Sequence, residues 1–154
     1  MMFRTHIAVG FLIGLFLLQI LNPVNQILFI FLMLLGAALP DIDHPESKIG
    51  SKIKVVGFLF EHRGFFHSLF AVLLLYLLLL HYIDSASVGV YIFAITAGYL
   101  SHVVTDSITK EGIMPFHPIS KFRVSGFIKT GRITEYVFLV IILAVSLWKL
   151  FSVY

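Results

Sequence analysis

The sequence predicts an all-α integral membrane protein, a bundle of about five transmembrane helices in one domain that covers residues 1–154. Of the 154 residues, 59% are hydrophobic and only 12% are charged, whereas about a quarter of a soluble domain is charged. The hydrophobic residues also form long blocks instead of the stripes of amphipathic helices. These blocks lie at 7–21, 27–39, 65–80, 88–104 and 136–151.

Each block is expected to form one helix, although the first two are short. A helix that crosses a bilayer needs about 20 apolar residues. The first two blocks reach that length only if flanking residues lie at the headgroups, namely His6, Asn22, Asn25 and Pro40. Alternatively, the two form a short hairpin that tilts or thins the bilayer. The N-terminus is expected to be retained, because "LNPVNQ" after the first block lacks a cleavage pattern.

The basic residues predict the orientation of the bundle. Ten of the 11 Lys and Arg residues lie before the first block or in segments 41–64 and 105–134, and the other side of the bundle holds only Lys149. Because short cytoplasmic loops of membrane proteins are rich in Lys and Arg, this side is predicted to be cytoplasmic in a multi-pass inner (plasma) membrane protein. Anionic lipid headgroups are a second expected use of the charge, and no nucleic-acid partner is expected.

The titratable side chains gather on the same predicted cytoplasmic side. Six of the seven histidines and seven of the eight acidic residues lie there, His81 and Asp84 being the exceptions. The middles of the blocks carry no ionisable residue, which argues against a proton or ion pathway. The pattern predicts a polar site at one membrane surface, formed by the loops 40–65 and 105–135.

Helical spacing predicts that the candidate ligands converge. On four helices a candidate stands four residues from a small residue, and small residues mark the faces on which membrane helices pack closely. The pairs are His6 with Gly10, Asp41 with Ala37, His67 with Ala71, and His102 with Gly98.

Histidine and carboxylate side chains without cysteine suit Zn²⁺, and also Mn²⁺ or Fe²⁺. The His-x-x-x-Asp spacing of His102 and Asp106 puts two ligands on one helix face. The candidate metal ligands are His6, Asp41, Asp43, His62, His67, His102, Asp106 and Glu135. Eight are too many for one ion, so two or three bridged ions are expected, an arrangement used for phosphoryl transfer. Asp41 and Arg63 are the candidate catalytic residues, Arg63 as a phosphate ligand.

Several candidates have a second interpretation. Asp43 is a possible N-cap of a short helix, and His44 fits the turn predicted by "DHPES". Glu135 stands at the start of the last helix, where a carboxylate interacts favourably with the helix dipole. His117, between two prolines, is either a late ligand or an interfacial side chain.

The motifs "LPDIDHPES", "HRGFFHS" and "GYLSHVVTDSITKEGIMPFHP", with "TH" at Thr5–His6 and the late Glu135, resemble the YdjM-type inner-membrane metal-dependent hydrolases. That family is similar to zinc-dependent phospholipase C and related nucleases, all-helical enzymes with a three-zinc site. The resemblance spans nearly the whole chain. It implies ligands at His6, Asp41 or Asp43, His62 or His67, His102 with Asp106, and Glu135.

One departure from the soluble relatives changes the expected number of ions. Those enzymes have a histidine soon after the His-x-x-x-Asp helix, which His117 could supply, and another four residues before the closing Glu. Gly131 occupies the latter position here, so a two-ion site is expected.

The expected function is a membrane-bound phosphoesterase that cleaves a phospholipid or lipid-linked phosphate with metal-activated water. The alternative is a non-enzymatic membrane protein with a structural metal or a lipid-binding polar cluster.

Overall fold

The computed structural model describes residues 1–43, 64–83 and 88–153. Within these residues the protein is helical and has no β-strand, only two isolated bridges. The long helices are α1 (Phe3–Leu21), α2 (Gln26–Ala38), α4 (Leu69–Tyr82), α5 (Gly89–Ser107) and α6 (Ile133–Val153). Two short 3₁₀ helices, η1 (Leu39–Asp43) and η3 (Phe65–His67), follow α2 and precede α4. The all-helical prediction is confirmed, with one α-helix for each hydrophobic block.

Short polar side chains set several of the helix ends. The Asn25 side chain accepts a hydrogen bond from the Leu28 amide at 2.9 Å at the start of α2, and Ser68 Oγ accepts one from the Ala71 amide at 3.3 Å at the start of α4. Both are N-caps that satisfy amides without a partner in the first turn. Asn22 ends α1 in the left-handed region, with φ 41°, a conformation that Asn tolerates better than most residues.

Two of the described helices are long and apolar enough to cross a membrane, at Phe3–Leu21 and Ile133–Ser152. Helices α2 and α4 have 13 and 14 residues, or about 20 Å of helix at 1.5 Å per residue. This is less than the roughly 30 Å of a bilayer core. Helix α5 has 19 residues, but five of its last seven are polar, which lowers its hydropathy: Ser101, His102, Thr105, Asp106 and Ser107.

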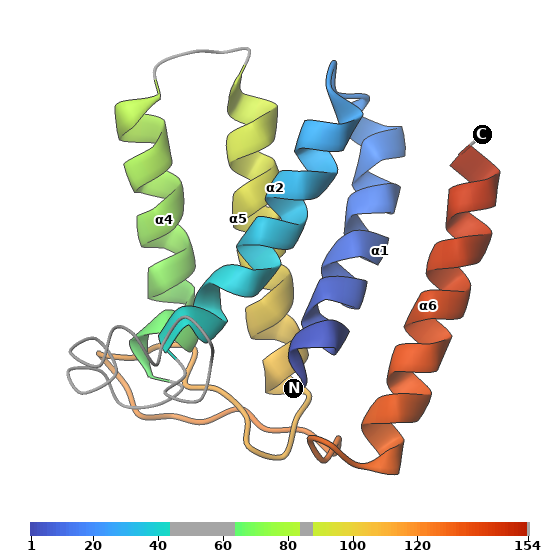
Figure 1. Cartoon of the computed structure of the whole chain (residues 1–154). Coiled ribbons are helices and arrows are strands. Elements are labelled where there is room, and N and C mark those ends of the chain that lie inside the picture. Colours follow the sequence, from blue (N-terminus) through green and yellow to red (C-terminus); the bar gives the residue numbers. More distant parts are fainter. Residues whose placement is uncertain (44–63, 84–87, 154) are drawn as a thin grey trace.

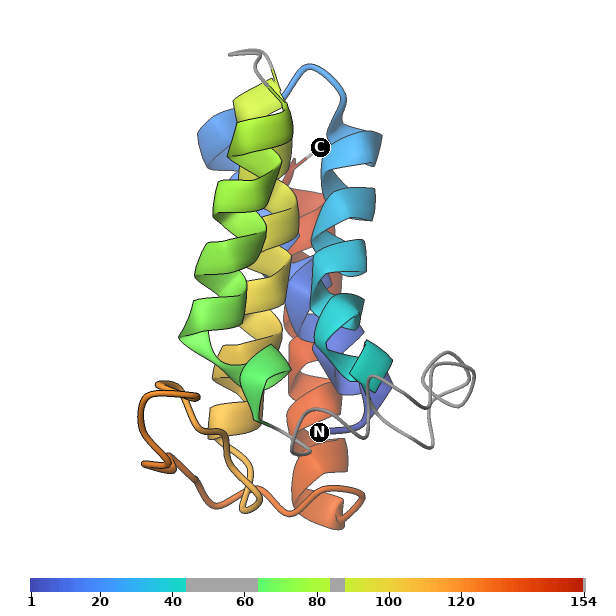
Figure 2. The same cartoon turned by 90° about the vertical axis from the view of Figure 1, so that its left-hand side faces the viewer.

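Successive helices run in opposite directions, so the five helix ends near the predicted ligands lie at the same end of the bundle. The start of α1, the end of α2, the start of α4, the end of α5 and the start of α6 all lie at the lower end of the bundle in Figure 1. The view in Figure 2 places them at the same end. The predicted ligands stand near these five helix ends in sequence, so the alternation brings distant parts of the chain to one place.

The tightest packing is between α2 and α5. A Cβ atom added to Gly36 would overlap the carbonyl oxygen of Ile95, and one added to Gly98 would overlap that of Met33. The two helices therefore approach backbone to backbone, as the small-residue spacing predicts. Phe29, Met33 and Ala94, all fully buried, form the core beside this contact.

A second apolar cluster supports the polar end of the bundle. It contains Val72, Tyr99 and Val103 from α4 and α5. The Tyr99 hydroxyl donates to the Phe66 carbonyl at 2.7 Å, and the Leu69 amide donates to the Pro115 carbonyl at 3.0 Å. These bonds fix η3, and with it His67, against the end of α5.

We expect Gly98→Ala to lower the stability of the protein, because the new methyl group must push α2 away from α5. Overpacking of this kind costs about 1–3 kcal/mol. Gly89→Ala is the matched control in the same helix, since a Cβ there meets nothing within 4 Å. Thermal unfolding in detergent, followed by circular dichroism, should show a lower midpoint for Gly98→Ala only. Equal midpoints would contradict the packing described.

Candidate metal centre

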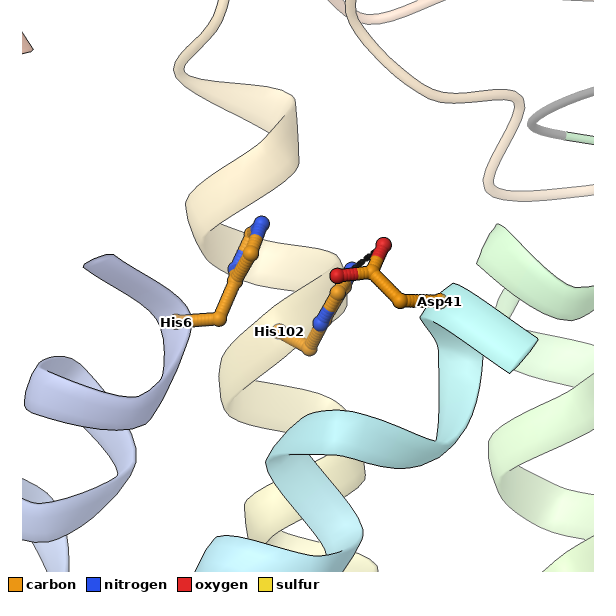
Figure 3. Close-up of side chains that lie close together, drawn as sticks. All are labelled: His6, Asp41 and His102. Atoms are coloured by element: carbon orange, nitrogen blue, oxygen red, sulfur yellow. Dashed lines mark ion pairs between the residues drawn. The ribbon is translucent and has the colours of Figure 1, made fainter. Parts of the chain in front are cut away.

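Five of the predicted ligands meet at the lower end of the bundle. His6 comes from α1, Asp41 from η1, His67 from η3, and His102 and Asp106 from α5. Two groups have ligand atoms within 4.8 Å of one another: His6, Asp41 and His102 form one, and His67, His102 and Asp106 form the other. Figure 3 shows the first group, with His6 and Asp41 on opposite sides of His102.

The cluster is almost closed to solvent. His6 and His102 are fully buried, Asp106 is 1% exposed and His67 is 2% exposed. The side chain of Asp41 is the open member, at 23%. Buried imidazoles and carboxylates require partners, because an uncompensated polar group in an apolar interior is costly.

Helix α2 fixes the tautomer of His102. Its Nδ1 lies 2.7 Å from the carbonyl oxygen of Ala37, and a carbonyl oxygen can only accept. Nδ1 therefore carries the proton, and Nε2 presents a lone pair to the cluster. In metal-binding histidines one ring nitrogen usually donates to a backbone carbonyl or a carboxylate, and the other ring nitrogen binds the metal.

A threonine does the same for His6. His6 Nδ1 lies 2.8 Å from Thr105 Oγ1, and that hydroxyl donates its single proton to the backbone carbonyls of Ser101 and His102, both at 2.9 Å. While the hydroxyl donates to these carbonyls, its oxygen accepts from His6 Nδ1, and in this tautomer Nε2 carries the lone pair. The rings of His6 and His102 stack, with centroids 3.6 Å apart and planes 10° apart.

The distances between the ligand atoms match a metal coordination shell. The Nε2 atom of His6 is 3.3 Å from Asp106 Oδ1. The Nε2 atom of His102 lies 3.6 Å from Asp41 Oδ1 and 3.7 Å from Asp106 Oδ2. Tetrahedral Zn²⁺ with bonds of about 2.0–2.1 Å sets its ligand atoms about 3.3 Å apart. Lone pairs that face carboxylate oxygens at this spacing repel one another unless a cation lies between them.

Asp106 is at the centre of the cluster. Its Oδ1 faces His6, and its Oδ2 faces His67 at 3.5 Å as well as His102. The α-amino group of Met1 also forms an ion pair with Oδ1, so a cation already contacts this carboxylate. The two oxygens point towards different histidines, which is the arrangement of a carboxylate that can bridge two ions.

Glu135 is fully buried but belongs to neither ligand group. Its Oε1 accepts hydrogen bonds from the Met2 amide at 2.6 Å and from Thr5 Oγ1 at 3.0 Å. Its Oε2 accepts one from the Gly131 amide at 2.7 Å. In this structure the carboxylate joins the start of α6 to the start of α1, next to the histidine at position 6.

Most of the other predicted site residues lie outside the part of the chain that the structure describes. His44, His62 and Arg63 lie outside the described residues, and so does the side chain of Asp43, whose backbone ends η1. His117 lies in the segment between α5 and α6, where its amide donates to the Met114 carbonyl at 3.1 Å.

Sequence reasoning missed the groups that orient the histidines. Thr105 stands three residues after His102 and directly before Asp106, so helical spacing was sufficient to find it. The Ala37 carbonyl leaves no trace in the sequence, because every residue has one.

Comparison with known proteins gives the family. The model of a family described as YdjM inner membrane protein matches residues 1–153. The uncharacterized protein YvsG of Bacillus subtilis is 35% identical over 105 residues, which are 65% of this chain and 64% of that protein. The inner membrane protein YdjM of Escherichia coli is 38% identical over 89 residues, which are 52% of this chain and 44% of that protein.

The matched segments thus span less than two thirds of the length of each relative. No solved structure matches the chain. The family match nevertheless covers almost every residue, including all five clustered ligands. The chain therefore belongs to the YdjM inner membrane protein family.

Proposed function

We propose that this protein is a metal-dependent hydrolase of the inner membrane, a phosphoesterase that acts on a phospholipid or a lipid-linked phosphate. The observation that carries the proposal is the set of buried lone pairs in the cluster. His6 and His102 each have Nδ1 engaged by a fixed acceptor, so both direct Nε2 towards carboxylate oxygens at 3.3–3.7 Å. A divalent cation is the partner that satisfies such a set of donor atoms.

The donor set supports Zn²⁺, with Mn²⁺ or Fe²⁺ as alternatives, and more than one ion. His102 has one free lone pair and can hold one ion, although it belongs to both ligand groups. A second ion would use His6 together with Asp106 Oδ1, in place of the Met1 amino group that contacts this oxygen. When bound, paired ions polarise a phosphate ester and activate water to attack it.

The remaining chemistry is expected of Asp41, His62 and Arg63. Asp41 is the exposed ligand, so it is the group that meets an arriving substrate. The predicted phosphate ligand Arg63 and the predicted ligand His62 belong to the chain segment between η1 and η3. Buried His6, His67 and Asp106 would hold the ions in fixed positions.

The position of the cluster favours a lipid substrate. It lies at one end of the bundle, where α1, α5 and η1 bring the ligands together, in a family of inner membrane proteins. If the bundle spans the membrane, that end lies at the membrane surface rather than at the midplane. The excess of Lys and Arg on this side supports a cytoplasmic orientation in a five-span topology. A lipid phosphate in that leaflet reaches the same depth without leaving the bilayer.

A structural metal is the second candidate. It is favoured by the near-complete burial of four of the five ligands, because structural zinc sites are closed while catalytic ones keep an open position. The number of ions separates the two functions: one ion with four protein ligands indicates a structural site, and two ions with bound phosphate or water indicate catalysis.

We expect His102→Ala and Asp106→Asn to lose bound metal and to reduce phosphate release from lipids by about 100-fold or more, since even outer-shell changes cost 10–100-fold. Elemental analysis of purified protein and a headgroup-release assay on phospholipid vesicles measure the two effects. His81→Ala is the matched control, because His81 is an exposed residue at the opposite end of α4. Normal metal content in both variants would refute the metal centre.

Thr105→Val should weaken metal binding by about 10–100-fold, because the change removes the oxygen that holds His6 Nδ1 while it keeps the shape of the side chain. Thr105→Ser keeps the hydroxyl and should bind metal like the parent. Competition with a chromogenic chelator in detergent gives the affinity, and equal unfolding midpoints for the two variants show that folding is unaffected. Equal affinities would mean that Thr105 does not position His6.

The absence of cysteine allows a direct test of the topology with single-cysteine variants. Ser125→Cys, in the segment between α5 and α6, should react with a membrane-impermeant thiol reagent only from the cytoplasmic side. Val24→Cys, between α1 and α2, should react only from the opposite side. Labelling of intact cells and of inverted vesicles distinguishes the sides, and reaction of both variants from one side would exclude the five-span arrangement.

A further inference from the structure

The segment 108–132, between α5 and α6, is strongly basic on its surface. It contains one acidic residue, Glu111, and five exposed basic residues: Lys110, Lys121, Arg123, Lys129 and Arg132. The Arg123 guanidinium donates to the Glu111 backbone carbonyl at 2.8 Å, and Thr130 donates to the Glu111 carboxylate at 2.7 Å. The single negative charge is thus engaged within the segment, and the lysines extend from its surface.

The same segment exposes large apolar side chains next to these charges. Phe122 is 61% exposed and stands between Lys121 and Arg123, while Phe127 is 75% exposed and stands two residues before Lys129. Phe116 and Ile119 are also exposed. Basic residues alone would serve to orient the protein in the membrane, but that role does not require exposed aromatic rings.

The exposure of these rings is set by backbone hydrogen bonds that hold the two ends of the segment together. Ile113 and Val124 exchange two hydrogen bonds, each 2.9 Å long, and the Lys110 amide donates to the Ile128 carbonyl at 2.9 Å. Gly126 approaches the backbone so closely that a Cβ would overlap the Ile108 carbonyl oxygen. The backbone bonds leave Ile113 and Ile128 buried and Phe122 and Phe127 outside.

The position of the segment at the end of the bundle indicates that it lies beside lipid headgroups. It begins where α5 ends and finishes at Ile133, the first residue of a candidate membrane span. Figures 1 and 2 both show it at the lower end of the bundle, where it runs from the end of α5 to the start of α6. A segment tied at both ends to helices of a membrane bundle lies at the headgroup layer, where alternating basic and aromatic side chains bind anionic lipid.

We propose that residues 108–132 form a binding surface for anionic phospholipid headgroups in the leaflet at the metal end of the bundle. Lys110, Lys121 and Lys129 contact the headgroup phosphates, and Phe122 and Phe127 insert at the boundary of the acyl chains. The surface needs no metal, so it stands independently of the proposed hydrolase. If the protein is a hydrolase, this surface concentrates anionic lipid beside the site.

The test uses the full chain in phosphatidylcholine vesicles, with a fluorophore on Phe122→Cys or Phe127→Cys. Spin-labelled phosphatidylglycerol and spin-labelled phosphatidylcholine with the same acyl label are the two quenchers. Trp148, the only tryptophan, is 66% exposed near the far end of α6 and serves as an internal reference. A Lys110→Gln, Lys121→Gln, Lys129→Gln variant removes the charges, and the corresponding Lys→Arg variant keeps them.

Both probes should be quenched more efficiently by phosphatidylglycerol than by phosphatidylcholine, whereas Trp148 should not distinguish the two lipids. The Gln variant should lose this preference by at least about fivefold, the effect of one interfacial lysine, and the Arg variant should retain it. Salt at about 1 M, where the Debye length falls to about 3 Å, should reduce the preference as well.

Two results would overturn the proposal. Equal quenching of the probes by both lipids would show that the surface does not select anionic headgroups. Absence of quenching by either lipid would place positions 122 and 127 in water, as expected of a surface for a protein partner. Neither result depends on metal content or on hydrolysis, so the proposed function would remain separately testable.

Discussion

The hydrogen bond from His102 Nδ1 to the Ala37 carbonyl joins the packing of the bundle to its polar site. It forms only because α2 and α5 approach backbone to backbone, and that approach depends on Gly36, next to Ala37, and Gly98, one turn before His102. A larger residue at either glycine would move the carbonyl away from the ring. The orientation of Nε2 is therefore set by helix packing, and the remaining ligands are arranged around it.

The polar cluster is stable in an apolar protein because every orienting atom is itself held. Thr105 is hydrogen-bonded both to His6 and to the backbone of α5, so it holds His6 in place. Tyr99 holds η3, which carries His67, through its hydrogen bond to the Phe66 carbonyl. Ordering long side chains after binding would cost conformational entropy. Here the hydrogen bonds that orient His6 and His102 form as the helices pack, so this ordering is part of folding.

The sequence was sufficient to predict the helices and most of the cluster. Hydrophobic blocks gave the five helices, and the four-residue spacing of small residues and ligands placed His6, Asp41, His67 and His102 on inward faces. It was not sufficient for Glu135, whose partners are the backbone amides of Met2 and Gly131 and the hydroxyl of Thr5. Amides are common to all residues, so no pattern marks them as partners. The starts of α2 and α4 also depend on the caps at Asn25 and Ser68. Helix α2 begins at Gln26, just before its hydrophobic block, whereas α4 begins at Leu69, inside its block.

Helix α6 is joined to the rest of the bundle chiefly through α1, and most of its surface is exposed. In the first turn of α6, the Glu135 carboxylate hydrogen-bonds to Met2 and Thr5 at the start of α1. Near the other end of α6, Lys149 contacts Gln19, and its Nζ atom lies 4.4 Å from the centre of the Phe16 ring. Glu135 and Lys149 are 14 positions apart, about four helical turns, and so lie on the same side of the helix. Between them the buried residues of α6 are Leu139 and Ser146, and the Ser146 hydroxyl bonds within its own helix. Lipid chains could replace this contact at little cost. The register of α6 against α1 is thus set by the polar contacts of Glu135 and Lys149. A shift of α6 by one helical turn would break both sets of contacts.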